Sequence, residues 1–374
     1  MEIIDLFSGV GGLSSGFVRQ GCKVVVANEI DQDIARSYTL NHPHTKMINA
    51  DITSIDIRKS FEKYCGKIDI VLGGPPCQGF SQKGNRKTIN DERNFLFRYF
   101  CDVVRFIQPK YFVMENVPNI LTAEKGFFKR ELTALFEDMG YAVDCGILNA
   151  SDYGVPQDRR RALFIGKKGV LPCSLPKSAG NKVTIWDAIS DLAFLESGEG
   201  SEDQSYPFDP ISEYQKSMRG GCNILHNHVS TAHSKDSIKK MSIIPPGSGK
   251  EILPRHMLTK SIYSGTWSRM IPDEQSVTIT TRFDTPSSGR FMHPYLNRCI
   301  TSREAARIQS FPDDFVFYGN KSSQMTQIGN AVPPLLSEAV ARVIVQDACS
   351  QDSSFICERN KSIIQTQLGC DYQF

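Results

Sequence analysis

One cysteine stands in a loop that is suited to presenting a thiol. Cys77 lies in the segment GGPPCQGFS, which directly follows a short apolar run. Two prolines and the nearby glycines restrict this loop, so we expect the thiol to be presented at the end of a strand rather than buried. A free thiol has a pKa of about 8.5 and needs a nearby cation or a helix N-terminus to act as a thiolate near neutral pH. Cys77 is therefore a candidate nucleophile.

A carboxyl group and two guanidinium groups follow other strand-like runs. Glu115 opens ENV at the end of YFVMENV, and Arg159 and Arg161 stand in QDRRR just before ALFIG. Because side chains alternate along a strand, we expect both arginines to point to one face. Glu115 could be a general acid or half of a structural ion pair, and its residue type allows both. Arginines at strand edges can be solvated or bind phosphate, and their closeness to Cys77 and Glu115 favours a shared site.

A glycine-rich segment, DLFSGVGGLSSGF, follows the first expected strand and opens the first expected helix. Gly9 and Gly11 let the backbone approach a ligand, and a helix N-terminus favours carboxylate or other anionic groups. The dinucleotide fingerprint GxGxxG is broken because Ser14 takes the place of its third glycine, and there is no GxxxxGK[ST] motif of an NTPase. Glu29 closes the second expected strand, where an acidic side chain can hold ribose hydroxyls. Asp51, near the end of a third, could accept a hydrogen bond from an adenine amino group, so the region could bind an adenosine-containing cofactor.

Short apolar runs alternate with amphipathic stretches over the first 170 residues, which predicts a βαβ sheet. The runs DIVLGG and YFVMEN are apolar on both faces and suit central parallel strands covered by helices. Helices are expected over residues 94–107 and 125–139. The expected strands are Ile3–Phe7, Lys23–Ala27, Ile68–Leu72, Tyr111–Met114 and Ala162–Ile165.

The character of the sequence changes near Lys167. From there to about Asn297 the chain is rich in Ser, Gly, Pro and Asn, which is typical of a small second domain or of a set of long loops. Regular structure returns at TSREAARIQ, a helix with Thr301 or Ser302 as its N-cap. A further helix is expected to start close after the prolines of GNAVPP.

Composition narrows the protein class only moderately. Hydrophobic residues make up 40% and charged residues 22%, as in ordinary globular proteins, and the formal net charge of +2 decides little. Eleven cysteines form no CxxC pair, which favours reduced, intracellular thiols over disulfides. The N-terminus lacks a basic n-region and no apolar run approaches the roughly 20 residues that span a bilayer, so we expect a cytoplasmic protein without a membrane partner. Metal is not expected, because the spacing of the four nearby candidates fits no standard zinc set; they are Cys222, His226, His228 and His233.

The order of these motifs resembles that of the DNA (cytosine-5) methyltransferases. PPCQ, ENV, QDRRR and IGNAVPP follow one another as in that family, and FSGVGG, Glu29, Asp51 and RIQSFPDDF also fit. The likeness covers roughly residues 1–348 and is broken only by the variable stretch that the family uses for target recognition. The similarity is greatest to bacterial enzymes of restriction-modification systems.

The resemblance implies an α/β fold with a Rossmann-like, S-adenosylmethionine-dependent methyltransferase sheet and a smaller, mostly irregular or β target recognition domain. The implied divisions are a catalytic and cofactor-binding domain at 1–170, a target recognition region at 171–300, motifs that return to the catalytic domain at 301–348, and a tail at 349–374. Cys77 would be the nucleophile, Glu115 the acid, and Arg159 with Arg161 the clamp on a flipped cytosine. Asn330 would join the cofactor side to the recognition domain. The cofactor would be surrounded by Phe7, Gly9, Gly11, Glu29, Asp51, Pro76, Leu96 and Asn330.

The resemblance also implies the partners: duplex DNA, a functionally paired restriction endonuclease, no obligate protein partner, and a monomeric, bacterial enzyme. Phosphate contacts could come from the dispersed basic residues of the recognition region. Two rivals remain. A tRNA cytosine-5 methyltransferase would share the catalytic residues, but its branch carries a cysteine after ENV where this chain has Pro118. A catalytically silent DNA-binding module would not need the intact catalytic set. The basic residues are Lys239, Lys240, Lys250, Arg255, Lys260 and Arg269.

Overall fold

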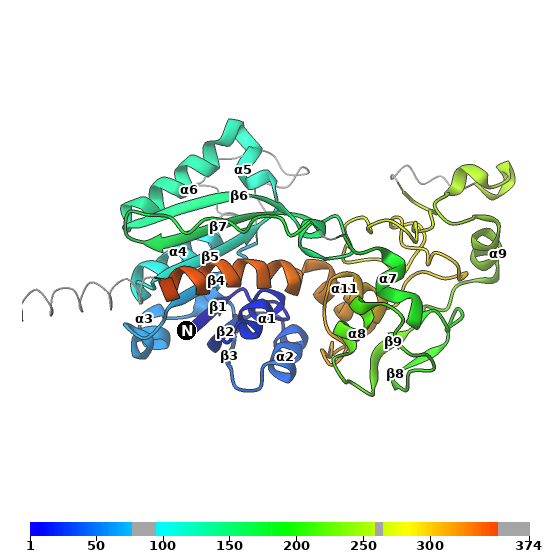
Figure 1. Cartoon of the computed structure of the whole chain (residues 1–374), viewed down its shortest axis with the longest axis horizontal. Helices are drawn as coiled ribbons and strands as arrows, with labels where there is room; N and C mark the ends of the chain where they lie inside the picture. The colour runs from blue at the N-terminus through cyan, green and yellow to red at the C-terminus, as the bar shows by residue number, and fades with distance from the viewer. Residues whose placement is uncertain (77–94, 181, 259–264, 351–374) are drawn as a thin grey trace, which may run out of the picture.

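The computed structural model describes residues 1–76, 95–180, 182–258 and 265–350. In this part of the chain two lobes lie side by side, one around a seven-stranded sheet and one of short helices with a two-stranded sheet (Figure 1). The strands are β1 (Glu2–Leu6), β2 (Lys23–Glu29), β3 (Lys46–Asn49), β4 (Ile70–Gly73), β5 (Tyr111–Asn116), β6 (Tyr141–Asn149), β7 (Arg160–Lys168), β8 (Gly200–Gln204) and β9 (Leu225–Val229). The large sheet has the order β3-β2-β1-β4-β5-β7-β6, and the small one pairs β8 with β9. The α/β fold predicted from the sequence is confirmed.

Helices cover both faces of the large sheet. Alternate residues of each central strand enter two different apolar cores: in β1, Ile3 packs on one face and Ile4 on the other. The helices of the sheet lobe are α1 (Gly12–Arg19), α2 (Gln32–Asn41), α3 (Ile57–Phe61), α4 (Phe95–Ile107), α5 (Asn119–Thr122), α6 (Phe127–Asp138) and residues 334–350. Phe61 of α3, Phe100 of α4 and Phe136 of α6 fill the core beside Ile4. Phe17 of α1 and the helix over residues 334–350 fill the core beside Ile3.

The far end of the sheet departs from the parallel pattern that the sequence predicts. The pairs β1–β2, β2–β3, β1–β4 and β4–β5 are parallel, as expected for central apolar runs. β7 pairs antiparallel with both β5 and β6, and β6 was not predicted. β6 was missed because its residues are half-buried at eight of its nine positions. An edge strand of this kind has no apolar alternation that a sequence pattern can detect.

The second lobe contains α7 (Ile185–Ile189), α8 (Glu213–Arg219), α9 (Lys235–Ile243), α10 (Ser302–Ile308) and α11 (Lys321–Asn330). It has its own apolar cores, one of which joins Ile185 and Ile300 to Ile328 of α11. The predicted helix at TSREAARIQ is confirmed as α10, with Thr301 as its N-cap in a capping box with Glu304. Residues 302–330 therefore pack with the irregular region before them, and the chain returns to the sheet with the helix over residues 334–350.

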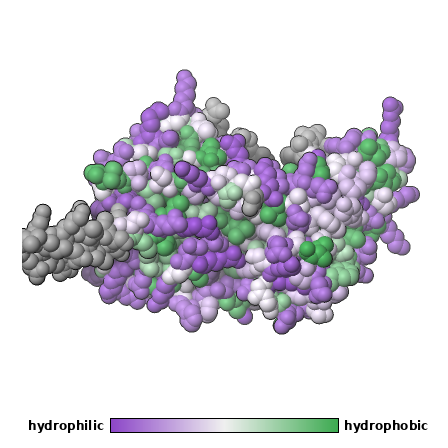
Figure 2. Space-filling model, in the orientation of Figure 1, coloured by the Kyte–Doolittle hydropathy of each residue, from purple (hydrophilic) through white to green (hydrophobic). Residues whose placement is uncertain are grey.

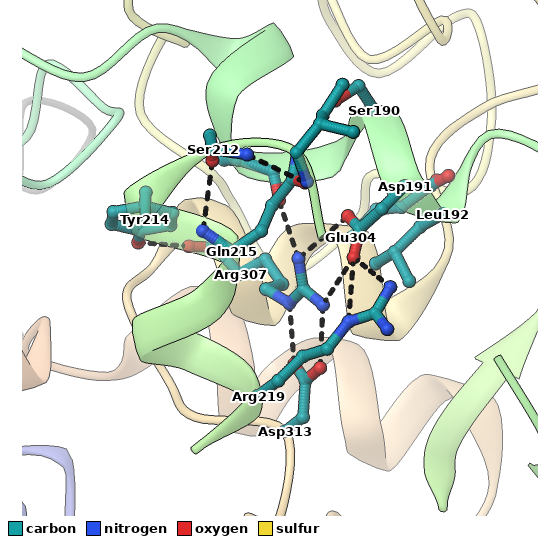
Figure 3. Close-up of polar contacts among 12 residues, drawn as sticks. Ser190, Asp191, Leu192, Ser212, Tyr214, Gln215, Arg219, Glu304, Arg307 and Asp313 are labelled. Atoms are coloured by element: carbon teal, nitrogen blue, oxygen red, sulfur yellow. Dashed lines mark hydrogen bonds and ion pairs between the residues drawn. The ribbon is translucent and has the colours of Figure 1, made fainter. Parts of the chain in front are cut away.

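A buried ionic network ties the second lobe together (Figure 3). The Arg307 guanidinium contacts Asp191 at 3.0 Å and Asp313 at 2.6 Å, and all three side chains are fully buried. Arg219 of α8 reaches the same Asp191 at 2.6 Å, while the Tyr214 hydroxyl donates to the Arg307 carbonyl. These bonds join α8, α10, the 3-10 helix Ser190–Leu192 that carries Asp191, and the turn that carries Asp313. The segments around α10 are therefore held by paired charges as well as by apolar packing.

One apolar segment qualifies the expectation about membrane spans. Lys321–Ser350, which comprises α11 and the helix after it, is long and apolar enough to cross a membrane by length and composition alone. However, 56% of its apolar window is buried within the protein, where Leu336, Val340 and Ile344 pack against the sheet. A core helix of a globular protein passes the same test. The face drawn in Figure 2 is mostly hydrophilic, with apolar side chains scattered in small groups.

Candidate active site

The carboxyl ends of β1, β2, β4 and β5 open into a cavity of about 540 Å³. This is the edge at which open α/β sheets bind their ligands, and sites for small molecules span about 300–1,000 Å³. Segments from the whole chain meet here, since the end of α11 closes the cavity opposite the sheet. The lining includes nine of the residues singled out from the sequence: Phe7, Gly9, Glu29, Asp51, Pro76, Leu96, Glu115, Arg161 and Asn330.

The turn after β1 is built on left-handed backbone geometry, with φ of 53° at Phe7, 55° at Gly9 and 90° at Gly11. The Gly9 amide points across the turn and donates to Glu29 Oε2 at 3.0 Å. Gly11 does not line the cavity. A Cβ there would lie 2.6 Å from Nε2 of His42 and 2.9 Å from the ring of Tyr38. Gly11 thus allows α1 to begin against α2, which is a packing role rather than a direct ligand contact.

Glu29 is the most strongly positioned acidic group of the cavity. Its Oε2 accepts from the Gly9 amide, and its Oε1 accepts from the Asp31 amide at 2.9 Å. Burial raises the pKa of Glu29, and these backbone hydrogen bonds oppose part of that rise. An ionised carboxylate offers about four acceptor positions. Glu29 can therefore accept further donors, such as a pair of hydroxyl groups, from a molecule in the cavity.

Asp51 and Asn330 are exposed residues of the cavity lining. Asp51 caps the short 3-10 helix Ile52–Ser54, where its Oδ1 accepts from the Thr53 amide at 2.9 Å. Its side chain is exposed, so a second oxygen is available to a ligand donor. Asn28, which sequence reasoning missed, donates to the carbonyls of Ile48 and Ala50 and so fixes the segment that carries Asp51. Asn330 is the exposed last residue of α11.

Glu115 and Arg161 form an ion pair at the inner end of the cavity. Nε of Arg161 lies 2.7 Å from Oε1 of Glu115, and the side chains are only 14% and 13% exposed. Burial raises the pKa of Glu115, and the positive charges of Arg161 and Arg159 offset part of that rise. The structural ion pair foreseen for Glu115 is thus present. A mostly buried carboxyl with a raised pKa is also what a general acid requires.

Arg159 does not share the position of Arg161. β7 begins at Arg160, so Arg159 belongs to the preceding turn, and its side chain is fully buried outside the cavity lining. Its Nη1 donates to the Ile279 carbonyl at 3.1 Å and its Nη2 to the Gly329 carbonyl at 2.7 Å. The expectation that both arginines present their guanidinium groups to one ligand therefore needs correction. Arg161 lines the cavity and Arg159 does not, and the two terminal nitrogens of Arg159 donate to backbone carbonyls instead.

Cys77, the candidate nucleophile, lies outside the described residues. The first described segment of the chain ends at Pro76, which lines the cavity together with Pro75. The Pro75 carbonyl accepts a hydrogen bond from Asn116 Nδ2 at 3.0 Å, so the residue after Glu115 fixes the start of the cysteine loop. Asn116 was not singled out from the sequence, although its place in ENV was the available signal. Lys260 and the tail from residue 351 also lie outside the described residues.

Asp5 is a second residue that sequence reasoning missed. It is 1% exposed, lines the cavity, and accepts a hydrogen bond from the Ser14 hydroxyl at 2.5 Å. Its Oδ1 is buried without a hydrogen-bond partner in the structure. Burial raises the pKa of Asp5 to about 7, and the nearby Glu29 adds to the rise. A charged residue inside an apolar strand was the signal that could have revealed it.

The four neighbouring residues considered as metal ligands have other partners in the described structure. His228 contacts Thr301 and the Leu192 carbonyl, His226 contacts Asp203, and His233 accepts from the Cys299 amide. In the part of the chain that the structure describes, no three His, Cys, Asp or Glu side chains are grouped to hold a metal ion. The Cys222 thiol contacts the carbonyl of Ile224.

The basic residues of the second lobe do not all face solvent. Arg269 is 3% exposed, and its guanidinium donates to the carbonyls of Met241, Ile244, His293 and Leu296. It is therefore a structural residue, and a phosphate contact from it is excluded in this conformation. Lys239 and Arg255 are exposed.

Comparison with known proteins fits this site. The family model for C-5 cytosine-specific DNA methylase matches residues 1–346. A type II methyltransferase of Desulfomicrobium norvegicum, M.DdeI, is 40% identical over 372 residues, which cover 92% of this chain and 88% of the relative. Another, M1.HphI of Haemophilus parahaemolyticus, is 37% identical over 353 residues, covering 92% and 87%. A crystal structure of a prophage-encoded candidate DNA modification methyltransferase (E. coli) superposes with a TM-score of 0.75 at 30% identity, covering 92% of this chain and 99% of that one.

The sheet, the cavity at its carboxyl edge and the solved relatives together define the methyltransferase class of α/β enzymes. Within that class, the chain belongs to the family of C-5 cytosine-specific DNA methylases. The resemblance read from PPCQ, ENV, QDRRR and IGNAVPP is thereby confirmed at the level of family and enzyme class.

Proposed function

We propose that this enzyme transfers a methyl group from S-adenosylmethionine to carbon 5 of a cytosine within a specific duplex DNA sequence, through a transient bond between Cys77 and carbon 6. The observation that carries the proposal is the cavity itself. It brings Glu29 and Asp51 on one side together with Pro76, Glu115 and Arg161 on the other. A cofactor region and a candidate acid thus share one enclosed space.

The cavity residues fit S-adenosylmethionine. Glu29 has acceptor capacity left for the ribose hydroxyls, and the exposed Asp51 carboxylate can accept from the adenine amino group. The buried, unpartnered Oδ1 of Asp5 marks a further polar position in the lining. Phe7, Gly9, Pro76, Leu96 and Asn330 complete the walls, whereas Gly11 supports them from behind. When bound, S-adenosylmethionine supplies the methyl group.

The chemistry assigned to the chain's own residues begins at Cys77. Carbon 5 of cytosine is a poor nucleophile because it belongs to an aromatic ring. Attack of the Cys77 thiolate on carbon 6 removes that conjugation, while protonated Glu115 donates a proton at N3 and Arg161 holds the O2 edge. After methyl transfer the N3 proton returns to the Glu115 carboxylate and the carbon-5 proton leaves to solvent. The bond between carbon 6 and the Cys77 sulfur then breaks, which releases the thiolate and 5-methylcytosine. Carbon 6 is inaccessible inside a stacked duplex, so the base must be flipped out.

The raised pKa of Glu115 supports its assignment as the acid. A carboxyl with an ordinary pKa would be ionised near neutral pH and would have no proton to give. Burial favours the protonated form, and Arg161 limits this effect so that the group can still release its proton. The same ion pair fixes the direction in which the carboxyl points, because the Arg161 side chain is itself mostly buried.

The division of labour along the chain is also a proposal. Residues 1–170 and 301–348 would supply the chemistry, and residues 171–300 would read the DNA sequence, with the exposed Lys239 and Arg255 near phosphates. The identity of about 40% to a type II methyltransferase supports a role in a restriction-modification system, in which methylation protects the host DNA from a paired endonuclease. Such an enzyme would act as a monomer in the bacterial cytoplasm, where the DNA is.

A methylation assay on a mixed-sequence plasmid, followed by bisulfite sequencing, tests the proposal. We expect protected cytosines at one short recurring sequence, and none when S-adenosylmethionine is omitted. A matched assay on tRNA separates the rival substrate. Methylation of tRNA without methylation of DNA, or no transfer to either by the folded protein, would contradict the proposal.

A further inference from the structure

Arg159 is a buried cation at a junction of three segments. Its two terminal nitrogens bridge the carbonyls of Ile279, in the second lobe, and Gly329, in the last turn of α11. Gly329 directly precedes Asn330, which lines the cofactor cavity. The Arg159 charge also acts on Glu115, whose pKa it helps to lower. One side chain thus connects the second lobe to the wall of the cofactor cavity, and its charge acts on the candidate acid.

Two neighbouring contacts hold the same junction. Gln157 is fully buried; its Oε1 accepts from the Ile279 amide at 2.8 Å, and its Nε2 donates to Gln309 Oε1 at 2.9 Å. On the other side, a Cβ at Gly329 would lie 2.4 Å from the Thr280 carbonyl oxygen, so the end of α11 packs directly on the backbone of that segment. Arg159 therefore acts between surfaces that are in close contact, where small displacements meet backbone rather than flexible side chains.

Arg159 is not placed to meet a base in the cavity, because its side chain does not line the cavity. Both terminal nitrogens donate to carbonyls, and the side chain is fully buried. Its Nε is buried without a hydrogen-bond partner among the described residues, yet Arg159 does not line the cavity. Arg161, by contrast, lines the cavity and pairs with Glu115. The two arginines of QDRRR have different environments and, on physical grounds, different tasks.

We infer that Arg159 is a positioning residue that fixes Glu115 and Arg161 relative to the second lobe and the cofactor wall, and that it does not contact the cytosine. This inference rests on the proposed function, because it concerns the same reaction. Loss of the bridge should misplace the acid and slow the chemical step, while leaving the binding of DNA and cofactor nearly intact. A displacement of about 1 Å in such a site can cost on the order of a hundredfold in rate.

The test compares Arg159→Lys, Arg159→Met and Gly329→Ala with the wild-type enzyme. Arg342→Met serves as the control, since Arg342 is exposed on the helix over residues 334–350 and pairs with Glu338 of the same helix. The single-turnover rate of methyl transfer is measured against pH on a duplex that carries the target found by bisulfite sequencing. Dissociation constants for DNA and for S-adenosylhomocysteine are measured in parallel, together with the melting temperature.

Arg159→Lys keeps the charge but cannot offer a rigid fork to two carbonyls, so its rate should fall about tenfold or more with nearly unchanged dissociation constants. Arg159→Met also removes a cation that lowers the Glu115 pKa. Because Glu115 must be protonated to act and its pKa rises when this cation is lost, the alkaline limb of the pH–rate profile of Arg159→Met should move to higher pH. The limb of Arg159→Lys should not move, since this variant keeps the charge. Gly329→Ala, which forces the junction apart without changing charge, should slow transfer without moving the limb.

Three results would overturn the inference. In the first, Arg159→Lys transfers the methyl group at the wild-type rate. In the second, the Arg159 variants lose DNA affinity but keep the wild-type single-turnover rate. In the third, all variants keep the alkaline limb of the wild-type pH profile and regain full activity below their melting temperatures. The second result would mean direct contact with the base, and the third a role in stability alone. If Arg159→Met does not fold, the rates and dissociation constants of Arg159→Lys and Gly329→Ala test the inference by themselves. An inactive wild-type enzyme would instead contradict the proposed function.

Discussion

Replacing Glu29 by alanine should weaken cofactor binding without removing DNA binding. The carboxylate lines the cavity and is held in place by the amides of Gly9 and Asp31. The change removes the acceptor proposed for the ribose hydroxyls. It also leaves the amides of Gly9 and Asp31 without this acceptor, although Gly9 lines the cavity and Asp31 is an exposed residue, so water can replace the carboxylate.

The magnitude follows from the contacts. A hydrogen bond to a charged group is worth about 1.5–3 kcal/mol, and a ribose offers two hydroxyls. The loss should therefore reach about 3 kcal/mol, which corresponds to roughly a hundredfold weaker binding. The loss of the Gly9 and Asp31 contacts should cost the fold about 1–3 kcal/mol, and each kcal/mol lowers the melting temperature of a protein of this class by about 2–4 °C.

Calorimetric titration with S-adenosylhomocysteine measures the effect, at a temperature well below the melting temperature of the variant. Glu137→Ala, which removes an exposed carboxylate from α6, is the matched control and should bind as the wild type does. DNA affinity should stay within a small factor of the wild-type value in both variants. If folded Glu29→Ala binds the cofactor analogue as tightly as the control, Glu29 is not the ribose ligand.

Three further predictions concern stability and specificity. Arg307→Met removes the cation shared by the buried Asp191 and Asp313 carboxylates and leaves Asp191 to Arg219 alone, so thermal unfolding should show a loss of about 3–5 kcal/mol. Exposed Arg105→Met, the control, should cost less than about 0.5 kcal/mol. Burial raises the Asp5 pKa from 3.8 to about 7, so the folded protein keeps a proton that the unfolded chain releases, and stability falls as pH rises through this window. Asp5→Asn should accordingly gain melting temperature over the wild type at pH 8 and much less at pH 5; an equal change at both would refute the assignment. Residues 171–300 can be exchanged for those of a relative that methylates a different target and keeps an acidic residue at the position of Asp191. The chimera should methylate the relative's target in a bisulfite assay. An active chimera that keeps the original target would contradict the assignment of residues 171–300 as the recognition region.

Much of the sheet and of the cavity was accessible from the sequence because both depend on local patterns. Runs that are apolar on both faces identified β4 and β5, and residues at the ends of these strands must meet at one edge of a parallel sheet. Glu29 and Glu115 were found in this way. The edge strand β6 has no such pattern, since it is half-buried along almost its whole length.

Contacts between distant segments could not be read from the sequence. Arg159 and Arg161 look equivalent in QDRRR, yet one meets the carbonyls of residues 279 and 329 and the other meets Glu115. Those partners lie more than a hundred residues away from Arg159. Arg269 likewise looked like a phosphate ligand and proved to be buried among backbone carbonyls. A side chain's type gives its chemistry, but its partner is decided by tertiary packing.

The covalent step is tested most directly with duplex DNA that carries 5-fluorocytosine at the target. Fluorine at carbon 5 permits addition and methylation but cannot leave as a cation, so elimination should stop with the protein still bonded to DNA. In the presence of S-adenosylmethionine, the wild-type enzyme should form a complex that survives denaturation and carries one added methyl group by mass. Cys77→Ser should form none, because a hydroxyl is a far weaker nucleophile than a partly ionised thiol, and Glu115→Gln should form it much more slowly. A trapped complex in the Cys77→Ser protein would contradict the assignment of the nucleophile.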